Sequence, residues 1–431
     1  MSLSSTAMLF QLPSVQRFVT TLAGELADRR SLVVLLPAGI APADIWTALQ
    51  AELWRRDLAC ETISLPDVPA GRAPVVTLGE ALRIHWSPAD TPRTIADLLG
   101  HGELPDIIQL EGLDQLSDAA REAWMDFLRQ WVQACQHMVD RGRQPTVLCL
   151  VMPALPVLAH IPEGSVHLAV HWWWRLPSAL EMRLLCRLGT PGQRLDARAR
   201  WQEYILPALA GSDLAVADHL WNDPYMDLRA LLHRLQAFAA QRGWAAETLR
   251  NWGAIELQSA GRYDHNAPRL APPQPWRTLW AHGALGATIE YGQELHPAAL
   301  AVLGRDEELQ HRLWRGQSEI LLPFIDQIRL HFCDHLTRAY GHDWPVRWRL
   351  PVSPEEELAV RGSPLACQWG HLEVLLKYCT PLRAERHWLP VASLARWIRN
   401  EIAHYRAITF RDFEGLWREV AHIDLLATWF I

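Results

Sequence analysis

Residues 31–55 read SLVVLLPAGIAPADIWTALQAELWR, and this stretch decides the fold of the first half of the chain. Ser31–Leu36 is a short, almost wholly apolar run of the kind that forms a buried strand. Pro37-Ala38-Gly39 breaks the run, and Ala43 to Arg55 then have the apolar spacing of a helix. A buried strand, a tight break and a helix are the repeating step of a parallel α/β sheet.

The same step recurs through the first 170 residues. Helical patterns separate further apolar runs, notably from Ser117 to Met138. Strands that alternate with helices predict an α/β domain with a doubly wound parallel sheet. The further runs of strand type are Thr62–Leu65, Asp106–Leu110, Thr146–Met152 and Val166–Val170.

The loop after the first strand is where such a fold can hold phosphate groups. A phosphate-binding P-loop needs several glycines followed by Gly-Lys-Ser/Thr. This loop has one glycine, Gly39, and no lysine, and the only lysine of the chain is Lys377. Ordinary P-loop ATP hydrolysis is therefore not expected, and no cofactor is predicted.

The string IIQLEGLDQL at residues 107–116 resembles the strand-end motif of NACHT and other STAND signalling ATPases. In that family, four apolar residues precede Asp-Gly-Leu-Asp-Glu, and the acids serve Mg²⁺ and water. Glu111 stands where Asp is usual, Asp114 fits, and Gln115 replaces an acid. The resemblance implies a degenerate P-loop-NTPase-like domain retained for binding or docking. The alternative is an unrelated α/β domain with an acidic turn after a buried strand.

The chain after the strand region becomes helical. Residues 1–175 are assigned to the α/β domain, and residues 176–266 to a helical extension. The segment 267–277 is predicted to be a linker, because four prolines within nine residues exclude a helix or a central strand. Residues 278–431 are predicted to form an all-α bundle, since the long helical pattern Asp306–Tyr340 is followed by at least three more helices.

A helix is predicted from Val391 to about Ala407. Its polar side presents Asn400 and His404 one turn apart. Arg396 lies one turn earlier, and Arg399 lies on the flank. The opposite, apolar stripe consists of Val391, Leu394, Ala395, Ile398, Ile402 and Tyr405.

These polar residues suit RNA cleavage. The imidazole of His404 can act as general acid or base on a ribose 2′-hydroxyl. Arg399 can offset charge on the phosphate, and Asn400 can orient either partner. Arg396 and Arg406 are candidates for further RNA contacts, and no metal is predicted. The alternative is an exposed helix face with a mixed polar stripe.

The string Arg399-Asn400-x-x-x-His404, followed by a second helix opening at Thr409, resembles the higher eukaryotes and prokaryotes nucleotide-binding (HEPN) domains. Their usual signature is Arg, a polar residue, three further residues and His on a helix of an all-α bundle. Many members are metal-independent ribonucleases whose active site forms between two copies of this helix in a dimer. The resemblance covers the last quarter to third of the chain.

This resemblance implies an endoribonuclease with RNA as substrate, tRNA among the candidates, and a homodimer formed through the C-terminal bundle. By analogy with the family, the role is a toxin or antiviral defence effector regulated by the N-terminal domain, with a regulatory protein as a further partner. Two alternatives stay open. One is a non-catalytic interaction or regulatory subunit of a defence or signalling assembly, and the other is a STAND-like nucleotide-binding switch.

Composition limits these readings. The net charge of −7 argues against broad electrostatic capture of nucleic acid, so any RNA contact must be a local arginine patch. The seven cysteines are scattered without a C-x-x-C pair, which favours a reduced, cytoplasmic setting without a disulfide framework or zinc cluster. No apolar run approaches the roughly 18 residues of a membrane helix, so no membrane partner is predicted.

Overall fold

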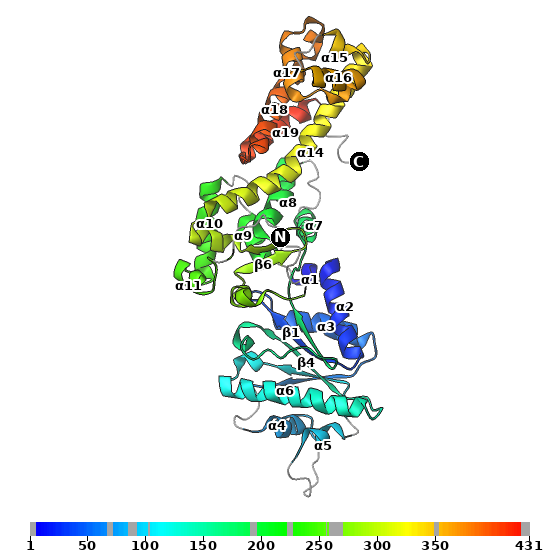
Figure 1. The fold of residues 1–431 in the computed structure, drawn as a ribbon, viewed down its shortest axis with the longest axis vertical. Helices are drawn as coiled ribbons and strands as arrows, with labels where there is room; N and C mark the ends of the chain where they lie inside the picture. The colour runs from blue at the N-terminus through cyan, green and yellow to red at the C-terminus, as the bar shows by residue number, and fades with distance from the viewer. Residues whose placement is uncertain are drawn as a thin grey trace. The chain divides into compact units, whose positions relative to one another are not determined.

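The computed structural model of the 431-residue chain forms two compact units, each built from segments that are distant in sequence (Figure 1). The sheet unit comprises Ser4–Glu181 and Ala245–His296. The helical unit comprises Met1–Leu3, Met182–Trp244 and Pro297–Ile431. The structure describes residues 6–66, 72–84, 93–101, 104–189, 196–221, 227–255, 257, 270–348 and 353–423.

The sheet unit contains five parallel strands in the order β2-β3-β4-β1-β5. Each of the five apolar runs forms one of these strands, with ends within two residues of those predicted. The α/β prediction is therefore confirmed. The strands are β1 (Ser31–Leu36), β2 (Cys60–Ser64), β3 (Ile107–Glu111), β4 (Val147–Pro153) and β5 (Leu168–Trp172).

Helices cover both faces of the sheet (Figure 1). On one face, α2 (Pro13–Ala27) packs against α3 (Pro42–Trp54). On the other, α6 (Asp118–Val139) packs against α4 (Pro74–Ala81) and α5 (Ile95–Leu99). The sheet is thus doubly wound, as predicted.

The central strand β1 shows why its sequence is apolar at every position. All six of its residues are buried, and Val33 lies opposite Leu150 of β4 and Val170 of β5. A parallel strand covered by helices on both faces has no solvent side, so its side chains do not alternate.

Residues 245–296 also belong to the sheet unit, through α11 (Ala246–Asn251), α12 (Arg277–Ala281) and the antiparallel hairpin of β6 (Leu285–Thr288) and β7 (Gly292–Leu295). Trp280 of α12 anchors this segment. Its indole N–H donates to the Trp173 carbonyl at 3.1 Å, and its ring packs edge-on against Trp172.

This grouping differs from the predicted division at residues 267–277 and 278. Residues 270–296 carry short helices and a hairpin on the sheet unit, because buried tryptophans that are distant in sequence pack together there. Residues 267–269 of the predicted linker lie outside the described residues.

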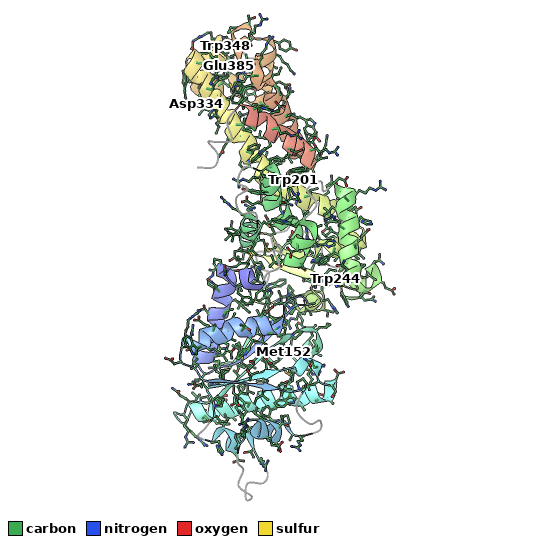
Figure 2. The ribbon with its side chains drawn as sticks, turned by 180° about the vertical axis from the view of Figure 1, so that it is seen from behind. Met152, Trp201, Trp244, Asp334, Trp348 and Glu385 are labelled. Carbon is green, nitrogen blue, oxygen red and sulfur yellow. The ribbon has the colours of Figure 1, made fainter. Side chains whose placement is uncertain are left out.

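The helical unit is organised around α14 (Asp306–Tyr340), which packs against α8 (Ala197–Ala210) and α18 (Leu389–Ala403). Gly316 allows the close approach of α14 to α8, since a Cβ there would lie 2.9 Å from the Ala208 Cβ. The fully buried Trp201 of α8 stacks on Phe413 of α19 (Phe410–His422) in the core (Figure 2). The prediction of a helical C-terminal region is confirmed from Pro297 onward, whereas the all-α bundle predicted for residues 278–431 is wrong at its start, where β6 and β7 form a hairpin.

The remaining elements are short. Among the described residues, every helix is too short or too polar to cross a bilayer. The remaining helices are α1 (Thr6–Leu9), α7 (Ala179–Leu188), α9 (Leu214–Trp221), α10 (Leu228–Gln241), α13 (Pro297–Leu303), α15 (Trp344–Arg347), α16 (Pro354–Gly362) and α17 (Trp369–Tyr378), with 3-10 turns η1 (Leu113–Gln115), η2 (Leu155–Val157), η3 (Gln274–Trp276), η4 (Pro364–Ala366) and η5 (Thr380–Trp388).

The end of α18 differs from the prediction. The helix stops at Ala403, His404 is its C-cap, and Tyr405 adopts a left-handed φ of 58°. Arg406 N–H then donates to the Glu401 carbonyl at 2.9 Å, which closes the helix end as a Schellman motif. The prediction that Tyr405 extends the apolar stripe is wrong. The residue is 67% exposed, and its ring lies 4.7 Å from that of Trp314.

Candidate functional site

The carboxyl edge of the parallel sheet is the first place to look for a ligand, because open α/β sheets bind ligands there. The loop after β1 packs instead on the turn after α12. Ala38 N–H donates to the Ala281 carbonyl at 2.8 Å. Gly283, at φ +75°, sits so close that a Cβ would lie 3.1 Å from the Ala38 carbonyl oxygen. A phosphate cradle needs backbone N–H groups that are open to the ligand, and the Ala38 N–H already has a partner.

The start of α3 is equally unsuited to phosphate. The helix begins at Pro42, which has no N–H to donate, and its first turn carries the acidic Asp44. A carboxylate at a helix N-terminus already occupies the favourable end of the helix dipole and repels an anion.

Glu111, at the end of β3, takes part in a hydrogen-bond chain across two strands. Its carboxylate accepts from Gln109 Nε2 at 2.7 Å, and Gln109 Oε1 accepts from the Thr62 hydroxyl at 2.8 Å. Gly112 follows at φ +78°, and a Cβ there would lie 2.4 Å from Pro66 Cδ. The predicted acidic position is therefore part of the strand-end structure.

Asp114 lies in the turn η1, whose backbone is fixed by Arg121 of α6. The Arg121 guanidinium is largely buried. Arg121 donates to the carbonyls of Leu113, Asp114, Leu116 and Pro156.

Among the described residues, no group of three or more His, Cys, Asp or Glu side chains is arranged to hold a metal ion.

The helical unit contains a groove of about 520 Å³ between α14, α16, α17 and α18. We call it the arginine groove, because its wall holds three arginines and two carboxylates. Its lining residues are Leu322, Ile325, Asp326, Arg329, Glu356, Gln368, Trp369, Gly370, His371, Arg396, Arg399 and Asn400.

Arg399 is an exposed cation of this groove. Its Nη1 donates to Asn400 Oδ1 at 3.3 Å, and within the described parts of the chain it forms no ion pair with a carboxylate. The structure thus brings two predicted site residues into one wall, with the positive charge of Arg399 available to an anion.

Arg396 is positioned by a buried carboxylate. Its Nη1 donates to Glu373 Oε2 at 2.6 Å, and Glu373 also accepts from Lys377 and Ser393. Burial alone would raise the pKa of Glu373, but the hydrogen bonds from Lys377, Arg396 and Ser393 lower it to about 2. The predicted RNA contact Arg396 therefore lines the groove with its charge already paired.

The guanidinium of Arg329 is also used in hydrogen bonds within the protein. It donates to Asp326 at 2.9 Å, and to the carbonyls of Leu365 and Cys367. These bonds join α14 to the turn η4 before α17. Arg329 therefore holds the segment before α17 against α14.

His371 is a groove residue that was not predicted from the sequence. Its side chain is 15% exposed, its Nδ1 accepts the Gln368 N–H at 3.4 Å, and its Nε2 lies 4.0 Å from Glu356 Oε2. Gln368 and His371 together form the capping box of α17. The only sequence signal is a polar residue followed three positions later by histidine at a helix start, and histidine is not a usual residue there.

His404 and Arg406 lie outside the groove lining. His404 is exposed, one turn after Asn400, at the C-cap of α18. Arg406 is exposed and pairs with Glu401 at 3.3 Å. The helix was predicted to run to about Ala407, but α18 ends at Ala403, so Arg406 lies beyond it.

A second titratable cluster lies elsewhere in the helical unit, around Glu385 (Figure 2). The Glu385 carboxylate forms a hydrogen bond with His335 Nε2 at 2.9 Å and accepts another from the Tyr340 hydroxyl at 3.1 Å. Burial raises the pKa of Tyr340, and the neighbouring Glu385 raises it further. Trp388 packs against Phe332 beneath this cluster, which ties η5 to α14.

The comparisons with known proteins assign no family. No family model and no curated protein matches the chain. Among solved structures, the chain is similar to one in the structure described as Drosophila ORC bound to poly(dA/dT) DNA and Cdc6. The sequence identity is 14%, with 94% of this chain and 68% of that chain covered and a TM-score of 0.29. A similarity at this TM-score is too distant to support a statement about function.

Proposed function

We propose that the helical unit is a metal-independent endoribonuclease that binds RNA at the arginine groove. The observation that carries the proposal is the shared wall of Arg399 and Asn400, in which Arg399 has no carboxylate partner among the described residues. A guanidinium without a counter-ion, beside an amide and in a groove of nucleotide size, suits a phosphate group.

The reaction needs only the RNA and side chains. The 2′-oxygen attacks phosphorus, the bond from phosphorus to the 5′-oxygen breaks, and the products are a 2′,3′-cyclic phosphate and a 5′-hydroxyl. One group must take the 2′ proton and another must give a proton to the leaving oxygen. His404 serves as one of these groups, and Arg399 stabilises charge on the phosphate. Asn400 orients the groups. A second copy of the chain supplies the other imidazole.

The biological part of the proposal is a toxin or antiviral effector that the sheet unit regulates. The support is the resemblance of residues 399–404 to the HEPN signature and of residues 107–116 to the STAND motif. Since the Ala38 N–H bonds to the chain's own Ala281 carbonyl, regulation through docking is favoured over regulation through nucleotide hydrolysis.

The test is cleavage of total RNA and of tRNA by the purified chain in EDTA. Wild type should cut and leave cyclic phosphate ends. Arg399→Ala and His404→Ala should each lower the rate by about 100-fold or more, in the range of general acid–base and electrostatic contributions.

Matched controls are His342→Ala and Arg418→Ala, both exposed residues of the helical unit outside the groove. They should cut like wild type. The ribonuclease proposal fails if the purified wild type does not cut RNA and if expressing wild type harms cells no more than expressing His404→Ala. The non-catalytic interaction subunit then replaces it.

A further inference from the structure

We infer that His371 is a phosphate-contacting residue of the arginine groove, donating from Nε2 beside Arg399 and Asn400 of the same chain. The inference rests on the proposed function, because it names a binding residue of that same site. It also goes beyond that function, because His371 precedes Arg399 by 28 residues and lies outside the motif.

The hydrogen bonding of His371 fixes which nitrogen carries the proton. The Gln368 N–H donates to Nδ1 at 3.4 Å, so Nδ1 acts as the acceptor and is unprotonated. The neutral ring therefore carries its proton on Nε2. A neutral imidazole in this tautomer is a hydrogen-bond donor, which is the property a phosphate oxygen needs.

The surroundings of His371 suit an anion. Arg399 contributes a positive charge that forms no ion pair with a carboxylate within the described chain. Trp369 and Gly370 open the ten-residue helix α17, and the first N–H groups of a helix have no intrahelical partner. Trp369 also lines the groove, and its indole N–H has no hydrogen-bond partner among the described residues.

The negative charge of Glu356 disfavours the binding of an anion in the groove. Its carboxylate lies 4.0 Å from His371 Nε2 and accepts the Ser353 N–H at 3.0 Å, so the α16 capping box holds it in place. Hydrogen bonds from the Ser353 N–H and hydroxyl keep the pKa of Glu356 below its ordinary value. The nearby His371 lowers this pKa too, by the smallest amount. The carboxylate stays charged near neutral pH and opposes a phosphate that approaches Nε2.

A consequence is that the phosphate-binding half of the site is complete within one chain. His371, Arg399 and Asn400 all belong to the same helical unit. A second copy is then needed for the chemical step and not for holding the phosphate.

The experiment measures binding and cleavage in parallel, with inorganic phosphate and a short single-stranded oligoribonucleotide as probes. Binding is followed through the His371 ring resonances for phosphate and by fluorescence anisotropy for the oligonucleotide. The variants are His371→Gln, His371→Glu and Glu356→Gln. Arg399→Ala is included as the reference for loss of binding and cleavage. Both Gln and Glu are usual at the N3 capping position, so each keeps the start of α17 folded. Circular dichroism verifies this.

We expect His371→Gln, which keeps a donor, to bind the oligonucleotide within about threefold of wild type. His371→Glu, which places a negative charge in the groove, should weaken binding about tenfold or more, because hydrogen bonds to charged groups are worth about that factor. Glu356→Gln should strengthen binding about two- to fivefold, in the range of exposed ion pairs.

The outcomes separate this inference from the proposed function. If phosphate binds in a His371-dependent way and RNA stays intact, the pocket stands and the ribonuclease fails. If RNA is cut, and His371→Glu binds and cuts like wild type while Arg399→Ala does not, the inference is overturned alone. Absence of phosphate binding to the wild type also overturns the inference.

Discussion

The carboxyl edge of the sheet and the arginine groove differ in how their polar groups are used. At the sheet edge, Ala38 N–H donates to Ala281, and Glu111 accepts from Gln109. In the groove, the guanidinium of Arg399 has only Asn400 as a partner within the described chain. The fold makes the sheet edge the expected site, but the groups left for a ligand lie in the groove. The comparison teaches that a site is recognised by its available chemistry, and not by the fold that surrounds it.

The largest expected effect tests whether the sheet edge is structural. Arg121→Ala should lower the free energy of unfolding of the sheet unit by about 3 kcal/mol, since it leaves four carbonyls near η1 without their charged donor. Urea denaturation measures the loss, and hydrogen exchange of β3 assigns it to the sheet unit.

Arg129→Ala is the control for this substitution, because Arg129 lies on the same helix and pairs at the surface with Asp126. It should cost less than about 0.5 kcal/mol. An Arg121→Ala variant as stable as wild type would show that the turn does not depend on this guanidinium.

A smaller effect tests how Arg396, one of the three groove arginines, is held in place. Glu373→Gln should cost about 2 kcal/mol at pH 7, because it removes the charge that holds Arg396. The folded pKa of Glu373 is depressed from 4.5 to about 2. Its contribution is therefore fully present above pH 4.5 and is lost as the pH falls toward 2. The gap between wild type and variant should shrink over that window in urea denaturation.

Glu414→Gln serves as the comparison, since the only ion pair of Glu414 within the described chain is a surface pair with Arg418. That variant should lie within about 0.5 kcal/mol of wild type at every pH. A Glu373→Gln gap as large at pH 3 as at pH 7 would contradict the role given to the charged carboxylate.

The smallest effect expected is that of nucleotide on the sheet unit. ATP with Mg²⁺ at millimolar concentration should change the melting temperature by less than about 1 °C, because the Ala38 N–H is already bonded and the loop has no lysine. A ligand at a hundred times its dissociation constant stabilises a protein by about 2.7 kcal/mol. A rise of several degrees would therefore reopen the nucleotide-switch alternative.

The sequence predicted elements that carry a strong local signal. Ser31–Leu36 forms β1 at the predicted bounds, because a strand buried on both faces must be apolar throughout. The helix predicted to open at Thr409 begins there, because Thr409 and Asp412 form the capping box of α19. Asp306–Tyr340 forms one helix at its predicted bounds, and Pro323 lies inside it.

Other features depend on tertiary contacts and left little sequence signal. Tyr405 ends α18 in a left-handed conformation that tyrosine rarely adopts, with its ring against Trp314. The strands β6 and β7 have four residues each, too few for a clear alternation. His371 and Arg399 line the same groove because α17 packs on α18, and no spacing along the chain encodes that arrangement.

The most direct test of the central claim compares one substitution from each region in the same assay. Wild type, Arg399→Ala and Glu111→Gln are incubated with tRNA in EDTA, and the rate of cleavage is measured. We predict that wild type and Glu111→Gln cut at similar rates, while Arg399→Ala cuts about 100-fold more slowly or not at all. Full activity in Arg399→Ala, with loss of activity in Glu111→Gln, would contradict it and place the site at the sheet edge.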